Sequence, residues 1–438
     1  MRDLYRYWKT KKIDKIVCAC LIAALLLGGG FMGLNSYHIE QRMLDVGSEE
    51  SENVSLDLLV SKNVSAGPES TSADEIGTSG QMEVAAKSAL LMDADSGAVL
   101  FAHNEHDELP LASVTKVMTM LLVLEAVDSG KISLEDEVII SERAAGMGGS
   151  QMYMEVGEQH TMEEIMKGVA MVSANDGCVA AAEHVSGTVE IFVEMMNKRA
   201  SELGMEHTNF VNTNGLPADH HYSSAYDIAV MSRELLKHID GHSWFTTWQD
   251  TILVGLPGKQ TEFGLTNTNK LIKQYPGAIG LKTGYTKDAG YCLSGAATRE
   301  GMTLIAVVMG CETSEIRTKE ISKLLDYGFA NYDTAVLAEK GQVMGEISLE
   351  KGSPESINAV TAEKSSVLVN KGEAGNVTAE AILWEIEKFP LKKGDQVGEL
   401  RILKDDQEIS RQPLVADQAA EKASITEIYR RMLLKLSR

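Results

Sequence analysis

Positively charged residues are scarce in this chain of 438 residues. It holds 41 Lys and Arg residues against 63 Asp and Glu residues, which gives a formal net charge of −22 at pH 7. Proteins that bind nucleic acid need clustered Lys and Arg to neutralise phosphates, so this balance argues against a nucleic-acid partner. The apolar and charged fractions, 44% and 24%, are ordinary for a globular protein.

Cysteine is also rare, and its spacing fits neither a disulfide framework nor a metal site. The five cysteines are Cys18, Cys20, Cys178, Cys292 and Cys311. The first two lie in an apolar segment, and we expect the other three to be buried thiols that act as small hydrophobes. No H-E-x-x-H motif occurs, and His220 and His221 are adjacent, which argues against a zinc peptidase. We expect neither a metal nor an organic cofactor.

One long apolar run stands near the start of the chain. Residues 16–34 are about 19 apolar or small residues, which is long enough to cross a bilayer. Six basic residues precede the run: Arg2, Arg6, Lys9, Lys11, Lys12 and Lys15. This bias predicts a cytoplasmic N-terminus and an exported body. A cleaved signal peptide would look similar, but no clear A-x-A site follows, so residues 1–35 favour a cytoplasmic tail with an uncleaved membrane anchor.

The chain after this run divides into four predicted parts. Residues 36–83 are rich in Ser, Glu, Gly, Asn and Asp, as in GSEESENVS, and predict a disordered acidic linker. Residues 84–334 carry long helical patterns between strand-like runs at both ends. This order predicts an α+β domain, with an antiparallel sheet built from distant parts of the chain and covered by a helical cluster. Short alternating runs in 335–416 predict a small all-β sandwich.

The last part, residues 417–438, contains a predicted amphipathic helix. Ile425, Ile428, Met432, Leu433 and Leu436 follow the spacing of one helical face. Basic residues lie outside that face, so the helix is suited to a lipid headgroup layer. The alternative is a helix that packs on a neighbouring domain or on a partner protein.

A serine and a lysine stand three positions apart in the apolar run LASVTKVMTM. On a helix these residues, Ser113 and Lys116, share a face, so the hydroxyl and the amine can form a hydrogen bond. The lysine can accept the hydroxyl proton only if burial or a nearby cation lowers its pKa from about 10.4. The alternative is a serine at a helix N-cap, followed by a lysine whose amine reaches solvent.

A second motif, SAN at 173–175, stands between two apolar helix patterns. A short loop at that point can direct the polar side chains of Ser173 and Asn175 into a cleft. Alone, this tripeptide is weak evidence for a site, and its value depends on the other motifs.

A third motif, KTG at 282–284, opens the strand-like region. The charge of Lys282 can bind a substrate carboxylate and can also lower the pKa of Lys116. The Thr283 hydroxyl adds a hydrogen-bond donor, and Gly284 lets a substrate backbone approach closely. The three motifs in this order indicate a site for serine acyl transfer.

This set of motifs resembles the penicillin-interacting serine acyl transferases, in which S-x-x-K, S-x-N and K-T-G line one cleft. The segments DELPLASVTKVMT, MNKRASELGMEHTNFVNTNGLP and LKTGYTKDAGYCLSGAA are most similar to the D-alanyl-D-alanine carboxypeptidases, the low-molecular-mass, type-5 penicillin-binding proteins. The resemblance covers about residues 84–334 and continues more loosely through the β domain. It implies the penicillin-binding/β-lactamase-like transpeptidase fold. Members of the family carry a C-terminal amphipathic anchor and usually begin with a cleaved signal, so the N-terminal run is a departure.

The resemblance also implies roles for the motif residues. Ser113 would attack the carbonyl of the penultimate D-alanine of peptidoglycan stem peptides, and Lys116 would be the base. Ser173 would relay a proton to the leaving D-alanine, and Asn175 would hold the peptide backbone and the lysine. The backbone N–H groups of Ser113 and Tyr285 would form the oxyanion hole. β-Lactams would acylate the same serine as covalent inhibitors.

Further residues are implied on the carboxylate side of the site. Lys282 and Thr283 would bind the terminal carboxylate of the substrate. The family also uses an arginine after the strand that follows K-T-G, and here Arg317 is the first candidate and Arg299 the weaker one. The catalytic domain would act on the outer face of the cell membrane, in the bacterial cell wall.

Two other functions compete with the carboxypeptidase interpretation. A serine β-lactamase shares the acylation residues but needs a deacylating base, and neither S-D-N nor E-x-x-L-N occurs at the required place. A non-catalytic cell-wall binding protein could keep the same fold. The complete set of motif residues argues against it, since a binding protein needs no base beside a nucleophile.

Overall fold

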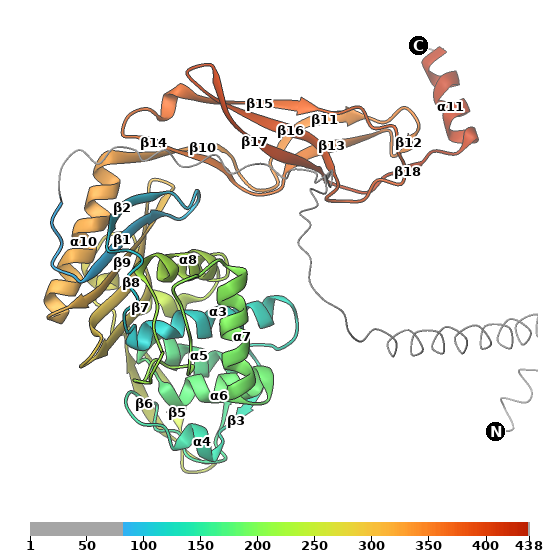
Figure 1. Cartoon of the computed structure of the whole chain (residues 1–438). Coiled ribbons are helices and arrows are strands. Elements are labelled where there is room, and N and C mark those ends of the chain that lie inside the picture. Colours follow the sequence, from blue (N-terminus) through green and yellow to red (C-terminus); the bar gives the residue numbers. More distant parts are fainter. Residues whose placement is uncertain (1–81, 437–438) are drawn as a thin grey trace, which may run out of the picture. The chain divides into compact units, whose positions relative to one another are not determined.

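The computed structural model describes residues 82–436 (Figure 1). A five-stranded antiparallel sheet with the strand order β2-β1-β9-β8-β7 organises the first part of this region. Its strands are β1 (Ser88–Asp93), β2 (Val99–His103), β7 (Ala278–Thr286), β8 (Gly290–Arg299) and β9 (Met302–Cys311). Strand β1 pairs with β9 across more than two hundred intervening positions. The predicted pairing of distant ends of the domain is therefore confirmed.

Both faces of the sheet are covered, which explains why its strands are apolar without alternation. Along β1, Leu90 and Met92 belong to one hydrophobic core, whereas Ala89 and Leu91 belong to a second core on the opposite face. Helix α10 (Ser314–Asn331) packs on the second face through residues such as Leu324. The cluster of helices labelled α3 to α8 in Figure 1 builds the first core.

The helical elements of this cluster follow one another along residues 112–236. Their bounds are η2 (Ala112–Thr115), α3 (Lys116–Asp128), α4 (Glu142–Ala145), α5 (Met162–Met171), α6 (Asn175–Ser186), α7 (Val189–Glu202) and α8 (Ala225–Leu236). Side-chain caps fix several starts, because a hydroxyl satisfies a backbone N–H that has no partner in the first turn. Thr161 and Glu164 form a reciprocal capping box at α5.

Short helices and two hairpins connect the helices of this cluster with each other and with the sheet. They are η3 (Ser243–Phe245), α9 (Leu271–Gln274), and two hairpins made of β3 (Glu137–Ile139) with β4 (Gln159–Thr161) and of β5 (Gln249–Val254) with β6 (Thr261–Thr266). Most of the methionines near the site motifs belong to the first core, including Met118 and Met166. They act as apolar filler there.

An all-β domain follows, as predicted. Its main sheet has the order β11-β13-β17-β16-β15, and smaller pairs join β10 with β14 and β12 with β18. The elements are β10 (Tyr332–Ala338), β11 (Val343–Ser348), β12 (Gly352–Ser353), β13 (Ser356–Thr361), β14 (Ser365–Asn370), η4 (Ala374–Asn376), β15 (Val377–Leu383), β16 (Gln396–Lys404), β17 (Gln407–Ala416) and β18 (Glu421–Lys422). Strand β10 already starts at Tyr332, ahead of the predicted boundary at 335.

The C-terminal helix α11 spans Ile425–Leu436 and lies within residues 417–438, where an amphipathic helix was predicted. The predicted membrane anchor at 1–35 and almost all of the linker lie outside the described residues. Within residues 82–436, no helix combines the length and the apolar character needed to span a membrane.

Candidate active site

Ser113 and Lys116 meet where a tight turn becomes a helix. Ser113 lies in the 3₁₀ turn η2, and Lys116 is the first residue of α3. Side chains at i and i+3 eclipse in a 3₁₀ turn. Lys116 Nζ accordingly lies 2.9 Å from Ser113 Oγ. Lys116 is 0% exposed, so the alternative of a lysine that reaches solvent is wrong.

Two further oxygens surround the Lys116 amine. Its Nζ lies 2.7 Å from Asn175 Oδ1 and 2.5 Å from the main-chain oxygen of Asn214. Asn175 belongs to the predicted SAN motif, whereas Asn214 was not predicted as a site residue. Its contribution is a backbone carbonyl, which any residue type carries, so no side-chain signal could have revealed it.

Burial changes the acidity of this amine. Loss of hydration lowers the pKa of Lys116 from 10.5 to about 8; a thiolate at Cys178, where it forms, and the carboxylate of Asp176 act in the opposite direction. The Cys178 thiol is itself buried, and its pKa is raised to about 11. Since the thiol is therefore neutral at neutral pH, it does not restore the positive charge of Lys116. A substantial fraction of the amine is neutral near pH 8.

The SAN loop joins α5 to α6 in a constrained conformation. Ser173 has a φ of 65°, a left-handed backbone conformation that non-glycine residues seldom adopt. Its Oγ is buried and has no hydrogen-bond partner in the described part of the chain. Asn175 is fixed from a second side, since its Nδ2 donates to Gly148 O at 2.7 Å and its N–H to Ser150 O at 2.7 Å. The loop thus fixes Asn175 beside Lys116, while the hydroxyl of Ser173, nearby in the sequence, stays uncommitted within the described residues.

A buried carboxylate that the motifs did not indicate supports this loop. Asp176 accepts hydrogen bonds from the backbone N–H groups of Met152 and Gly177 at 3.0 and 2.9 Å. Burial raises the pKa of the Asp176 carboxyl, and the backbone donors oppose that shift. The interaction ties the segment around Met152 to the start of α6. The only signal in the sequence was an acidic residue in the first turn of an apolar helix.

The KTG motif lies inside β7, beside the turn that carries Ser113. A Cβ atom placed on Gly284 would lie 2.8 Å from Leu111 O and 3.1 Å from Ser113 N. Only a glycine therefore permits this approach of strand to turn. Thr283 is buried, and its Oγ1 lies 2.8 Å from Thr268 Oγ1, which positions the hydroxyl.

Lys282 brings a second buried amine to the site. Its pKa is lowered well below 10.5, first by burial and then by the positive charges of Lys116 and Arg317. Its Nζ donates to Thr283 O at 2.9 Å. Within residues 82–436, neither Lys282 nor Lys116 forms an ion pair with a carboxylate. The site thus gathers basic groups that have no carboxylate partner among the described residues.

The two candidate arginines lie in different surroundings. Arg317 is buried on α10, donates through Nη1 to Cys292 O at 3.4 Å, and is close enough to Lys282 to lower its pKa. Arg299 instead stacks its guanidinium 4.3 Å from the ring centre of Tyr275 and 4.8 Å from that of Phe329. The geometry therefore favours Arg317. This is the order in which the resemblance had ranked the two residues.

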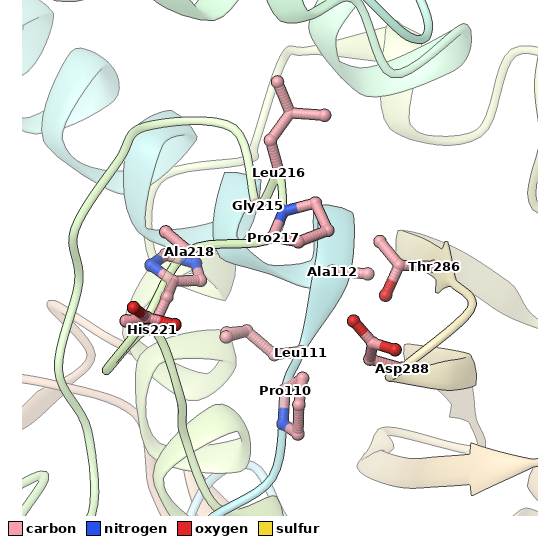
Figure 2. A pocket seen from close by; sticks show the side chains of 11 residues that line it. Pro110, Leu111, Ala112, Gly215, Leu216, Pro217, Ala218, His221, Thr286 and Asp288 are labelled. Atoms are coloured by element: carbon pink, nitrogen blue, oxygen red, sulfur yellow. The ribbon is translucent and has the colours of Figure 1, made fainter.

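Tyr285 follows KTG at the open side of the site. It is mostly exposed, and its ring centre lies 4.3 Å from that of Tyr291. A cavity of about 230 Å³ opens next to the nucleophile turn, with Ala112 and Gly215 on one wall and Thr286 and Asp288 on another (Figure 2). This hollow adjoins Ser113 without containing it.

Histidine and carboxylate groups elsewhere have structural partners. His221 is buried between Thr115 Oγ1 at 2.8 Å and Val211 N at 2.9 Å, and burial lowers its pKa to about 4. Glu125, Glu234 and His238 could meet at one metal ion. However, Arg199 pairs with the first two at 2.8 and 3.0 Å, so their negative charge is already compensated.

A serine hydroxyl beside a buried amine, with two remote motifs in the same region of an α+β fold, defines a serine acyl transferase of the penicillin-interacting class. The comparisons with known proteins agree. Residues 75–313 match the family described as D-alanyl-D-alanine carboxypeptidase, and residues 332–422 match the C-terminal domain of penicillin-binding protein 5. The chain belongs to the D-alanyl-D-alanine carboxypeptidase family and is a serine-type peptidase.

Individual relatives cover most of the chain. D-alanyl-D-alanine carboxypeptidase DacF of Bacillus subtilis is 42% identical over 349 residues, which are 80% of this chain and 89% of the relative. DacD of Escherichia coli is 32% identical over 78% of this chain and 89% of its own length. The crystal structure of penicillin-binding protein 5 from Haemophilus influenzae superimposes with a TM-score of 0.62 at 32% identity, covering 78% of this chain and all of that one. The predicted family and fold are confirmed.

The contact between Gly284 and the nucleophile turn can be tested by adding one methyl group. Gly284→Ala should slow acylation by a fluorescent penicillin by ~10-fold or more, because even a small displacement of reacting groups is costly. Gly264→Ala in β6 is the control, since a Cβ there meets no atom within 4 Å. Equal rates in the two variants, measured by gel fluorescence, would contradict the proposed close approach.

Proposed function

We propose that the protein removes the terminal D-alanine from peptidoglycan pentapeptide stems through an acyl-enzyme on Ser113. One observation carries the proposal: the fully buried amine of Lys116 lies 2.9 Å from the Ser113 hydroxyl. Membership of the D-alanyl-D-alanine carboxypeptidase family supports the identity of the bond that is cleaved. No metal or organic cofactor enters the proposed reaction.

The surroundings of Lys116 suit a neutral base. A neutral amine has two N–H donors and one lone pair. The oxygens of Asn175 and Asn214 accept the two N–H groups, so the lone pair is left for the Ser113 O–H. These hydrogen bonds therefore fix the direction of the lone pair as well as the position of the amine. Ser113 can then transfer its proton to Lys116 while its oxygen attacks the carbonyl carbon of the penultimate D-alanine.

The remaining motif residues complete the proposed reaction. The backbone N–H groups of Ser113 and Tyr285 receive the developing negative charge on the carbonyl oxygen. Ser173, whose hydroxyl has no other partner within the described residues, relays the proton to the departing D-alanine nitrogen. The C–N bond breaks, D-alanine leaves, and water then hydrolyses the ester on Ser113.

On the leaving-group side, cationic residues bind the substrate carboxylate. Lys282, Thr283 and Arg317 are assigned to the terminal carboxylate of the stem peptide. This assignment gives Lys282 and Arg317 an anionic partner, which they lack among the described residues. A penicillin carries a carboxylate beside its reactive amide, so the same residues would bind it and Ser113 would be acylated.

The two alternatives remain less consistent with the site. A serine β-lactamase needs a base for rapid deacylation, and the second motif here is Ser-Ala-Asn without an E-x-x-L-N segment before Lys282. A non-catalytic binding protein has no use for an amine whose pKa is lowered to about 8 beside a serine hydroxyl. Both alternatives predict results that differ from those expected for a carboxypeptidase.

Product analysis separates these functions. The chain should release one D-alanine from a muropeptide ending in D-Ala-D-Ala, and mass spectrometry should find a single penicillin adduct on Ser113. Ser113→Ala should lose both, whereas the control Ser129→Ala, at the end of α3, should lose neither. Adduct formation without release of alanine would reject the carboxypeptidase. Rapid multiple turnover of penicillin would indicate a β-lactamase instead.

The lowered pKa of Lys116 predicts a pH profile. The neutral amine is the active form, so below a pKa of about 8 most sites carry an ammonium group and are inactive. Acylation by penicillin should therefore rise ~10-fold per pH unit from pH 6 to 7 and level off above pH 8. Stopped-flow acylation rates at saturating and limiting penicillin would measure this. A rate independent of pH between 6 and 9 would contradict a base with this pKa.

We also propose that the catalytic domain, residues 84–334, is held at the outer face of the cell membrane. Residues 1–35 would form the anchor, 36–83 the linker and 417–438 a membrane-associating helix after the β domain 335–416. In α11, Ile425 is 86% exposed and Met432 is 57% exposed, although both are apolar. Lipid contact would remove these side chains from water.

Vesicle binding tests the role of α11. The chain without its first 81 residues should sediment with phosphatidylglycerol vesicles. The double variant Ile425→Asp/Met432→Asp should weaken this binding by ~10-fold or more, because it places charges on the lipid-facing side. Thr426→Asp/Arg430→Asp adds a larger negative charge on other positions of the helix. If that variant binds as weakly as the first or more weakly, attraction to the headgroups accounts for binding and insertion of the apolar face does not.

A further inference from the structure

The C-terminal β domain has two strand edges that lack a partner strand in the described part of the chain. In the order β11-β13-β17-β16-β15, strand β11 pairs with β13 alone and β15 pairs with β16 alone. An edge strand presents backbone N–H and C=O groups that another extended chain can pair with. Figure 1 shows this domain, with both strands labelled.

The two edges approach each other and enclose a groove. A Cβ atom on Gly345 of β11 would lie 2.7 Å from Leu383 Cδ1, so the side chain at the end of β15 rests on the backbone of β11. Beyond this contact the space widens into a cavity of about 490 Å³. It is lined by Glu346, Ile347, Ser348, Glu350, Lys351, Leu383, Trp384, Glu385, Ile386 and Glu387.

The groove is strongly acidic for its size. Four of its ten lining residues are glutamates and one is a lysine. None of the four glutamates, Glu346, Glu350, Glu385 and Glu387, forms an ion pair within residues 82–436. By contrast, the neighbouring glutamates Glu380 and Glu399 are paired with arginines at 2.6 and 2.9 Å. The groove therefore carries negative charge that the domain does not compensate internally.

Apolar side chains are exposed in the same place. Trp384 is 40% exposed and Leu383 is 36% exposed, and both line the groove. An indole face attracts cations as well as apolar groups. A free strand edge, an acidic border and an exposed indole together suit an extended peptide with alternating basic and apolar side chains.

We propose that this groove binds an extended, basic segment of a partner protein, which adds a strand to β11. Backbone pairing along β11 supplies the hydrogen bonds that are independent of sequence. The glutamates select basic side chains, and Trp384 and Leu383 receive the apolar ones. The groove belongs to the β domain, so this role is separate from the hydrolysis assigned to Ser113. Partner binding would locate the enzyme without taking part in its chemistry.

A synthetic peptide tests the proposal with the full chain in detergent. The probe is an eight-residue fluorescent peptide of alternating lysine and valine, and its binding is followed by fluorescence anisotropy. Glu346→Gln/Glu385→Gln should weaken binding by ~10-fold at low salt, since two charge contacts are lost. The control Glu339→Gln/Glu421→Gln removes the same charge from exposed glutamates outside the groove and should change binding less than ~2-fold.

Backbone pairing is tested with a second probe. The same peptide with N-methyl groups at alternate residues keeps its charges but loses the donors that a new strand needs, so it should bind ~10-fold more weakly. Equal binding of both peptides would overturn strand addition. Equal weakening by the two double variants would assign binding to the overall negative charge. A dimer in sedimentation that Glu346→Gln/Glu385→Gln disrupts would assign the groove to a second copy of the chain. Both of these outcomes would also overturn the proposal.

Discussion

The site depends on keeping a lysine amine out of water. Burial at the first turn of α3 removes the hydration that favours the ammonium form of Lys116 and lowers its pKa to about 8. A lysine on the surface at the same spacing from Ser113 would stay protonated and could not accept a proton. The apolar residues around LASVTKVMTM therefore have a chemical role, since the hydrophobic core that stabilises the domain also sets the charge state of its base.

A buried amine must still find hydrogen-bond acceptors, and three separate segments supply them. The turn before α3 provides Ser113, the start of α6 provides Asn175, and the loop before α8 provides the carbonyl of Asn214. Asp176 ties the α6 segment to the loop near Met152, and Gly284 allows β7 to lie against the nucleophile turn. The site thus forms only when the helical cluster and the sheet are assembled, which links its geometry to the stability of the whole domain.

The sequence revealed the parts of this site that depend on side-chain identity. Ser113, Lys116, Asn175 and Lys282 were predicted from three short motifs, and the α+β order followed from periodicity and from strands at both ends of the domain. Asn214 could not be predicted, because it acts through a main-chain oxygen whose position depends on tertiary folding. Arg317 was preferred over Arg299 from the resemblance alone. What separates the two in the structure is their tertiary contacts, which the sequence does not give: Arg317 donates to Cys292 O, whereas Arg299 stacks on Tyr275 and Phe329. The β domain begins at Tyr332, three residues before the predicted boundary at 335. The composition changes too gradually there to mark the exact start.

Charge balance on the carboxylate side of the site depends on the substrate. In the described site, the positive charges of Lys116 and Arg317 both lower the pKa of Lys282, after the larger effect of burial. On the proposed assignment, a substrate carboxylate bound at Lys282 favours the charged form of that lysine, because an opposite charge in a buried site raises the pKa of an amine. The carboxylate and the charged lysine together carry no net charge, so the pair adds little to the charge that Lys116 faces. On this assignment, the carboxylate compensates Lys282 and Arg317 while burial alone keeps the pKa of Lys116 low, whereas a ligand without a carboxylate would leave Lys282 and Arg317 without an anionic partner.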